Sequence, residues 1–421
     1  MVNARTVPTV LENIVSSATP APNSAAEGTC SAASSLAVLL LAVSAFIIVT
    51  TEFVIVGMLP SLARDLGVPV ATAGWLVTLF AFTVMLFGPL LTGLLSHHDR
   101  KRLFVVLLLV FAASNALAAL APNIWVLALG RFLPALALPV FWGTASETAA
   151  EIAGPERAGK AVSQVYLGIS GAMVFGIPLG TLAGDAFGWR GTFWGLAVLS
   201  LLMAVLLVKV MPTLARPQRV QLSHQMRILK DPVFLANIAL SVVVFTAMFT
   251  AYTYLADLLE QVARVPPAAV GWWLMGFGAV GLVGNWLGGL LVDRNPLQAT
   301  LGGALVLAVG MAATAPLAGH QAGLVVALAI WGIANTALYP ICQVRVMRSA
   351  SHAQALAGTL NVSMANAGIG LGALIGGGAI NRLGVGSVGT IAAAIAVVAV
   401  LMVPLIAGMS RRSAARSAQR P

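Results

Sequence analysis

The octapeptide "GLLSHHDR" at residues 93–100 recurs as "GLLVDRNP" at residues 289–296, which is 196 positions further along the chain. The same offset superimposes three glycines of one half on three of the other: Gly176, Gly180 and Gly188 fall on Gly372, Gly376 and Gly384. A chance self-alignment of Gly- and Leu-rich sequence is the alternative. A shared loop motif, shared glycines and halves of equal length instead favour an internal repeat, and so two equivalent structural units.

The composition places this repeat in a membrane. Of 421 residues, 59% are hydrophobic and 9% are charged, whereas soluble globular proteins average about 25% charged residues. Apolar runs of about 20 residues can cross the roughly 30 Å hydrocarbon core as helices. We count twelve, at 36–58, 71–95, 102–121, 124–149, 159–182, 191–210, 233–256, 268–291, 297–317, 322–344, 355–380 and 386–409.

The predicted fold is therefore an all-α membrane protein with twelve transmembrane helices in two pseudo-symmetric six-helix halves. The halves are expected at 36–210 and 232–409, joined by a basic linker at 211–231. Residues 1–35, rich in Ala, Ser, Thr and Pro, are expected to form a disordered tail, and 410–421 a basic tail. Parallel repeats of this kind are typical of secondary transporters, which bind substrate between the halves.

The positive charges predict the orientation. Most of the 23 Lys and Arg residues fall in loops on the side of the two termini. The exceptions are Arg64, Arg190, Arg264 and Arg382 on the opposite side, and Arg131 inside a span. Because cytoplasmic loops of membrane proteins carry the excess of Lys and Arg, both termini are expected in the cytoplasm. A net charge of +10 spread in this way does not indicate nucleic-acid binding.

Two charges lie within spans, Glu52 in the first and Arg131 in the fourth. Counted at 1.5 Å per residue, both lie roughly 10 Å below the outer surface, so Arg131 is the candidate partner of Glu52. A charge near the bilayer centre costs about 2.5–3.5 kcal/mol. In a structural interpretation the two form a fixed pair or bind water and carbonyl groups. In a functional one, Glu52 gains and loses a proton between two conformations.

The repeat favours function for Glu52, because the positions 196 residues on from Glu52 and Arg131 are Met248 and Ala327. A packing role shared by both halves would not need charges in only one. Polar and aromatic residues inside spans are candidate substrate ligands, although each can also anchor or cross-link helices. They are Trp142, Tyr252, Asn335, Tyr339, Asn361 and Asn366.

Several classes of site are not expected. The two cysteines, Cys30 and Cys342, predict neither a disulfide framework nor a metal site. No nucleophile–base pair or phosphate-binding loop is found in the spans, which argues against an enzyme and against ATP-driven transport. We therefore expect no cofactor beyond a proton gradient, a small-molecule substrate, the lipid bilayer as the surroundings, and a chain that can work as a monomer. A non-transporting membrane receptor is the alternative from another class.

The chain resembles the major facilitator superfamily, and within it the twelve-helix drug:proton antiporters, over residues 36–409. Of the signature G-x-L-x-D-R-x-G-R-[KR] after the second span, Gly93, Leu95, Lys101 and Arg102 are present, while His97 and His98 replace the Asp and Arg that the second copy keeps as Asp293 and Arg294. "GRFLPALA" (130–137) resembles the fourth-helix motif, in which Arg131 matches an arginine implicated in proton coupling. "GISGAMVFGIPLG" (168–180) resembles the fifth-helix antiporter motif through Gly176, Pro178 and Gly180.

Three further stretches resemble the branch of purine-ribonucleoside, purine-base and sugar efflux pumps: "TEFVIVGMLP", "FWGTASETAAEIAGPERAGKAVS" and "PLGTLAGDAFGWRGTF". In that branch a first-helix glutamate occurs at the position of Glu52. The resemblance implies a proton antiporter of the bacterial inner membrane that exports a small solute by alternating access. A purine nucleoside is the first expectation for the substrate, and hydrophobic drugs or sugars remain open. The glycine and loop-motif residues would be gating elements.

Overall fold

The computed structural model describes residues 24–95, 97–154, 157–212, 214, 225–350 and 353–418, and within these ranges every regular element is a helix. Residues 1–23 of the expected N-terminal tail and most of the expected linker lie outside the described residues. The first helix begins at Ser24 and the last ends at Ala418, so both extend beyond the expected outer limits of the spans at 36 and 409.

The first half consists of helices whose boundaries follow the apolar runs closely. They are α1 (Ser24–Leu66), α2 (Val70–Leu95), α3 (Arg100–Ala119), α4 (Ile124–Ala153), α5 (Ala158–Gly171), the π-helix η1 (Ala172–Gly176) and α6 (Ile177–Val210). Asn123 accepts hydrogen bonds from the main-chain N–H groups of Trp125 and Val126 and so fixes the start of α4.

The second half repeats this order after a short 3₁₀ turn, η2 (Gln225–Lys230). Its helices are α7 (Pro232–Tyr252), α8 (Leu255–Gln261), α9 (Pro267–Arg294), α10 (Pro296–Thr314), α11 (Gln321–Ser349), α12 (Gln354–Leu383), the 3₁₀ turn η3 (Val385–Ser387) and α13 (Val388–Ala418). In this half the first crossing is broken after Tyr252, where the chain turns before α8.

In the described part of the chain, eleven continuous helical stretches are apolar and long enough to cross a membrane, and one of them, Ala158–Val210, has 53 residues. A straight helix of that length would measure about 80 Å, far more than one crossing requires. It is interrupted at Gly188, whose φ of 76° is in the left-handed region. Gly384, 196 positions on, turns the chain with a φ of 84°. The 53-residue stretch thus contains the fifth and sixth crossings, which confirms twelve spans.

A second pair of repeat-related residues supports the equivalence of the halves. The Asp99 carboxylate accepts a hydrogen bond from the N–H of Arg102 at the start of α3. Asn295, the residue 196 positions on, accepts from the N–H groups of Leu297 and Gln298 at the start of α10. In the first loop the motif position of the acid is occupied by His97. Asp99, two residues further on, instead caps the start of α3.

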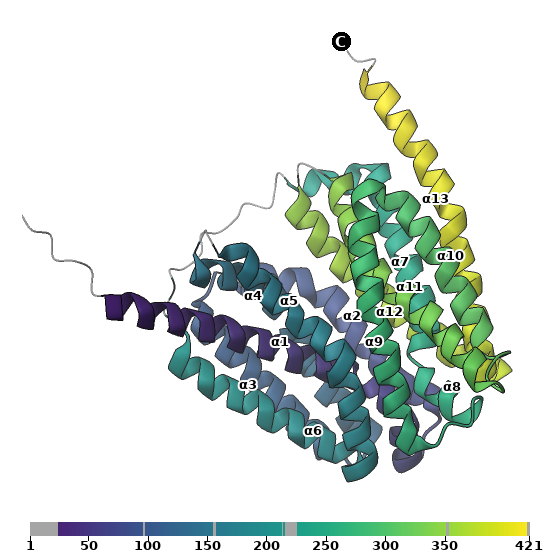
Figure 1. Ribbon diagram of the computed structural model, residues 1–421, viewed down its shortest axis with the longest axis horizontal. Helices are drawn as coiled ribbons and strands as arrows, with labels where there is room; N and C mark the ends of the chain where they lie inside the picture. The colour runs from purple at the N-terminus through teal and green to yellow at the C-terminus, as the bar shows by residue number, and fades with distance from the viewer. Residues whose placement is uncertain are drawn as a thin grey trace, which may run out of the picture.

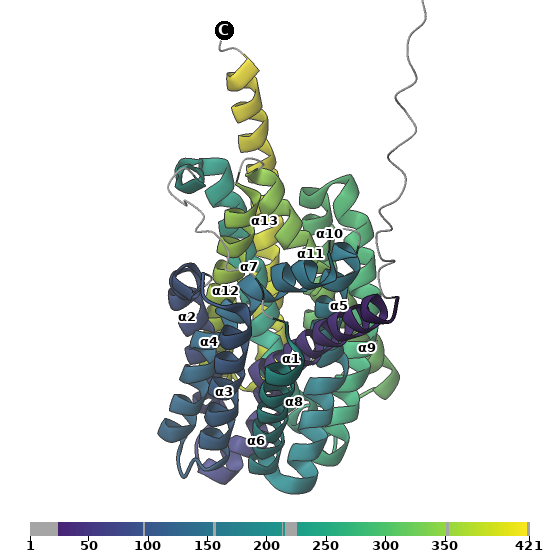
Figure 2. The same cartoon turned by 90° about the vertical axis from the view of Figure 1, so that its left-hand side faces the viewer.

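The two halves meet at the end of the molecule where α1 finishes, here called the closed end. In Figure 1 the halves are inclined to each other, and the start of α1 lies far from the finish of α13; Figure 2 shows the same arrangement from the side. At the closed end Arg64 of α1 forms an ion pair of 2.6 Å with Glu260 of α8, and these two residues are themselves repeat equivalents.

Tyr254, between α7 and α8, packs closely against both halves at the closed end. Its side chain is fully buried, and its hydroxyl donates to the Ala373 carbonyl oxygen of α12 at 2.8 Å. A Cβ atom at Gly74 of α2 would lie 2.0 Å from this hydroxyl oxygen, and one at Gly377 would lie 2.7 Å from it. Glycines of both halves therefore form the cradle that receives the tyrosine.

We expect Gly74→Ala to open the closed end, because the new methyl group occupies the position of the Tyr254 hydroxyl. Spin labels at the exposed positions Phe187 and Leu383, one in each half, should move apart in pulsed electron resonance measurements on the reconstituted protein. Gly195→Ala is the matched control, since no atom lies within 4 Å of its added Cβ. An unchanged label distance in Gly74→Ala would contradict a closing role for the Tyr254 contact.

Candidate functional site

Glu52 lies in the middle of α1 and is half-buried. On its own helix it is surrounded by apolar side chains, with Ile48 and Ile55 fully buried and Phe53 6% exposed. Among the described residues no Lys, Arg or His side chain lies within ion-pair distance of its carboxylate. The acid is thus held in the bundle without a fixed counterion.

Arg131 lies where the depth comparison predicts, yet its guanidinium group does not pair with the Glu52 carboxylate. It donates instead to main-chain oxygens of α1: one nitrogen binds the Thr51 carbonyl and the other the Glu52 carbonyl, the latter at 2.6 Å. A carbonyl oxygen has two lone pairs, so it can accept from arginine while it remains in the helix. The guanidinium also lies 4.5 Å from the centre of the Phe80 ring, a favourable cation–π contact.

The positive charge of Arg131 thus lies near Glu52, while its hydrogen bonds go to the main chain of α1. Arg131 is 1% exposed; two of its guanidinium nitrogens donate to the main chain of α1, and its Nε has no hydrogen-bond partner among the described residues. The carboxyl group of Glu52 is therefore not tied in a salt bridge to any described residue.

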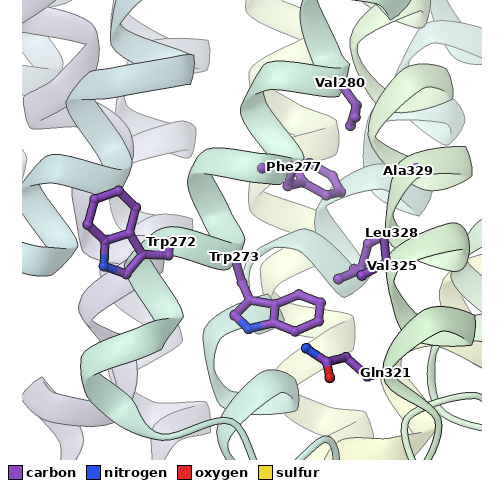
Figure 3. A pocket seen from close by; sticks show the side chains of 9 residues that line it. Trp272, Trp273, Phe277, Val280, Gln321, Val325, Leu328 and Ala329 are labelled. Atoms are coloured by element: carbon purple, nitrogen blue, oxygen red, sulfur yellow. The ribbon is translucent and has the colours of Figure 1, made fainter.

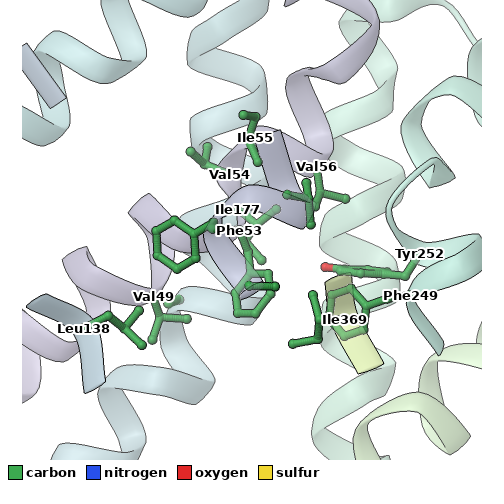
Figure 4. Close-up of a cluster of buried hydrophobic side chains, with 14 of the residues drawn as sticks. Val49, Phe53, Val54, Ile55, Val56, Leu138, Ile177, Phe249, Tyr252 and Ile369 are labelled. Atoms are coloured by element: carbon green, nitrogen blue, oxygen red, sulfur yellow. The ribbon is translucent and has the colours of Figure 1, made fainter. Parts of the chain in front are cut away.

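Aromatic rings connect the Glu52 segment to the second half. Phe53 of α1 lies 5.8 Å from Phe249 of α7, and the series continues to Tyr252 and then to Phe277 of α9, with centroid distances of 5.5 and 5.6 Å. Figure 4 shows Phe249 and Tyr252 facing the α1 segment of Phe53. Tyr339 of α11, stacked edge-on against Phe245 at 5.0 Å, lies within electrostatic range of both Tyr252 and Glu52.

The structure thus brings together four of the residues expected from the sequence: Glu52, Arg131, Tyr252 and Tyr339. The expected asparagines are placed differently. The Asn361 amide donates to Gln343 of α11 at 2.7 Å and cross-links two helices. Asn335 and Asn366 are buried, and the Oδ1 atom of each has no hydrogen-bond partner among the described residues.

Trp142 lies apart from this aromatic series. It contacts the neighbouring Phe141 edge-on at 5.5 Å on α4. Both rings belong to the first half. A ligand role for Trp142 stays a prediction.

The loop-motif residues lie at the end opposite the closed one. Gly93, Arg102 and Arg294 are exposed, and the Asp293 side chain is outside the described part of the chain. In the first half an ion pair of this region joins Arg100, which is 2% exposed, to the largely exposed Glu147 of α4 at 2.6 Å. Arg100, next to the capping Asp99, anchors α3 to α4 there.

Gly176, Pro178 and Gly180 lie at the junction of η1 and α6. Pro178 has no N–H to donate to the preceding turn, and the widened π-helical turn directly before it accommodates this loss. Added Cβ atoms at Gly176 and Gly180 would lie 2.0 and 2.3 Å from Thr50 and Val54. The helix face formed by these two glycines therefore packs on α1 of its own half. Contact with the second half is made from α9, where Gly278 lies against the main chain of Met173 and Val174.

A cavity of about 310 Å³ lies between α9 and α11. Figure 3 shows Trp272, Trp273 and Phe277 on one side and Gln321, Val325 and Leu328 on the other. It is separate from Glu52, and Phe277 is the one residue it shares with the aromatic series. Its lining contains no charged side chain.

Several residues of the site were not expected from the sequence. Phe53, Phe80 and Phe249 are ordinary apolar residues in a membrane sequence, and only the fold brings them to Glu52. The sequence also gives no indication of Thr51, because Arg131 binds its main-chain oxygen and every residue has one.

The comparisons with known proteins agree with this architecture. The family model of the Major Facilitator Superfamily matches residues 41–364. The chain is 36% identical to the inner membrane transport protein YdhP of Escherichia coli O157:H7, covering 87% of this chain and 94% of that protein. It is 30% identical to a probable sugar efflux transporter of Mannheimia succiniciproducens, covering 86% and 92%.

The chain belongs to the Major Facilitator Superfamily. Solved structures agree on the fold: a bacterial homologue of the lysosomal transporter Spinster, in an inward-facing and unoccupied conformation, gives a TM-score of 0.72 at 16% identity over 89% of this chain and 97% of that one. The nucleoside transporter NupG also gives 0.72, at 14% identity over 88% and 99%. The protein is a multi-pass transporter of the inner membrane.

We expect Arg131→Lys to reduce transport by about tenfold or more, because an ammonium group cannot bind two successive carbonyls and lie flat on Phe80 at once. Loss of one charged hydrogen bond corresponds to about 1.5–3 kcal/mol. Transport into inverted membrane vesicles measures the effect, with the exposed Arg382→Lys as the control. Full activity in Arg131→Lys would show that the two-carbonyl contact is dispensable.

Proposed function

We propose that this transporter exports a small organic solute in exchange for protons, with Glu52 as the proton carrier and Arg131 as its electrostatic modulator. The observation that carries the proposal is the state of the Glu52 carboxylate. It lies beside the junction of the halves and has no ion-pair partner among the described residues, while Arg131 is occupied by the Thr51 and Glu52 carbonyls.

The positions of the charges support coupling. A carboxylate in apolar surroundings favours its neutral form, and a change of surroundings alters that preference. Rearrangement of the two halves would change what faces Glu52 from the second half, where Tyr339 now lies within electrostatic range. Proton binding and the exchange between conformations would in this way depend on each other.

The distribution of Lys and Arg indicates which end of the molecule faces the cytoplasm. With the linker and both termini in the cytoplasm, the closed end sealed by Tyr254 and the Arg64–Glu260 pair is the outer end. The molecule then faces inward, which is the state in which an exporter loads its solute. Protonation of Glu52 from the outside would follow once the outer end opens.

The aromatic series favours a solute with a flat ring. Phe53, Phe249 and Tyr252 are buried at the junction of the halves, where their rings pack against one another, and a base stacked on such a ring in another conformation would gain about 1–3 kcal/mol. A purine nucleoside is our first candidate. A sugar is the second, favoured by the name of the Mannheimia relative. A purely hydrophobic drug would leave the tyrosine hydroxyls unused.

Glu52→Gln should abolish proton-coupled export while solute binding persists, because the amide keeps the shape of the carboxyl group and cannot carry a proton. The measurement is the acidification-driven flux of inosine, glucose and a hydrophobic cation in proteoliposomes, together with the fluorescence of an internal pH dye. Glu151→Gln, an exposed acid at the end of α4, is the control. Proton-coupled flux that survives in Glu52→Gln would end this proposal.

Phe249→Leu should weaken binding of the transported ring compound by about 5- to 150-fold, the equivalent of one lost stacking contact. Leucine keeps the site apolar, so the overall fold is expected to persist. Equilibrium binding of inosine and glucose to the purified protein distinguishes the two candidates. If neither affinity changes, the aromatic series does not contact the solute.

A further inference from the structure

We infer that Asn115 of α3 is a positioning residue for the Glu52 site. Its amide nitrogen donates to the Thr51 hydroxyl at 3.2 Å, and Asn115 is 2% exposed. Thr51 is the residue whose carbonyl oxygen binds Arg131, and its neighbour is Glu52. Asn115 thus connects a third helix to the segment of α1 on which the arginine and the acid meet. The inference rests on the proposed role of Glu52.

The repeat provides an internal test of whether the fold itself needs this polar group. The residues 196 positions on from Thr51, Glu52, Asn115 and Arg131 are Ala247, Met248, Met311 and Ala327. All four are apolar, and none is more than 1% exposed. The second half packs its corresponding helices with no polar atom at these side-chain positions, so the fold does not require Asn115.

The four polar residues therefore occur together in one half and are replaced together in the other. Thr51 and Glu52 come from α1, Asn115 from α3 and Arg131 from α4, so three helices converge on one turn. An asparagine at a buried helix contact needs a partner for its amide, and here the partner adjoins the proton site. Asn115 is part of this set by position as well as by contact.

The physical role is to keep the arginine on the main chain. While Asn115 holds Thr51, the carbonyl oxygens of Thr51 and Glu52 stay in reach of the two guanidinium nitrogens. When that hold is lost, the guanidinium is free to swing to the carboxylate of Glu52. Among the described residues, Arg131 from α4 and the Tyr339 hydroxyl from α11 are the groups that interact electrostatically with this carboxylate, so Arg131 is the cation that would take it.

A direct pair between Arg131 and Glu52 would favour the ionised carboxylate, and protonation would then require a more acidic solution. Infrared difference spectroscopy of the full-length protein in lipid, titrated with protons alone, follows the carbonyl band of a protonated carboxyl group. Glu52→Gln assigns the band, because only the Glu52 signal disappears from that variant.

In Asn115→Leu the midpoint of the Glu52 band should shift by at least about half a pH unit toward acid, the effect of a newly formed ion pair. Thr51→Val, which removes the acceptor with little change of shape, should shift it equally. The double variant should shift it no further, because both changes break one contact. Thr51→Ser keeps the hydroxyl, so the midpoint of the Glu52 band should stay at its wild-type pH.

Ser114→Ala is the matched control on the same helix, since the Ser114 hydroxyl donates only to the Val110 carbonyl of its own turn. A midpoint unchanged in both Asn115→Leu and Thr51→Val, with the band still assigned to Glu52, would overturn the inference and leave the proposed function intact. Persistent proton coupling in Glu52→Gln would overturn the proposed function, and the infrared midpoints would still decide the role of Asn115.

Discussion

The two-carbonyl contact of Arg131 on α1 is the constraint on which the centre of the first half depends. A guanidinium group inside a membrane bundle needs acceptors for its donors, and hydrocarbon supplies none. Here the acceptors are the main-chain oxygens of Thr51 and Glu52, and the flat face of the cation rests on Phe80. Because the main chain accepts hydrogen bonds from two nitrogens of the arginine, the guanidinium group is not paired with the carboxylate of Glu52.

This arrangement also explains why a helix with a buried acid is tolerated at all. A carboxylate tied in a salt bridge would be stable, but it would release and bind protons only at extreme conditions. A carboxylate with no cation nearby would stay protonated. In the proposed function, Arg131, close in space and bonded elsewhere, would provide an intermediate case in which both protonation states are accessible.

Much of the fold follows from the sequence alone. Apolar runs locate the helices to within a few residues, and the 196-residue offset predicts the pairs Gly188/Gly384 and Asp99/Asn295, which perform equal tasks in the two halves. The depth of Glu52 and Arg131 could also be predicted, since it requires only helix rise. The sequence could not indicate that the arginine binds carbonyls, because main-chain acceptors exist at every residue.

The sequence could not identify Phe53 and Phe249 as site residues, for a different reason. Phenylalanine is common in membrane helices, and only the approach of α1 to α7 distinguishes Phe53 and Phe249 from rings that face lipid. The expected asparagines illustrate the converse. Asn361 is conspicuous in an apolar run, yet its amide is committed to Gln343, as expected of a polar residue that cross-links helices.

The two halves therefore contribute different side chains to the site. The first half carries the charges, on α1 and α4, and the second carries the tyrosines, on α7 and α11. Phe53, the residue after Glu52, is one of the contacts between the halves, since its ring meets Phe249. Any rotation of the halves that opens the closed end must alter this contact, and with it the surroundings of the adjacent acid. A solute seated on the rings and a proton seated on Glu52 would thus act on the same turn of α1, which is the simplest physical basis for their exchange.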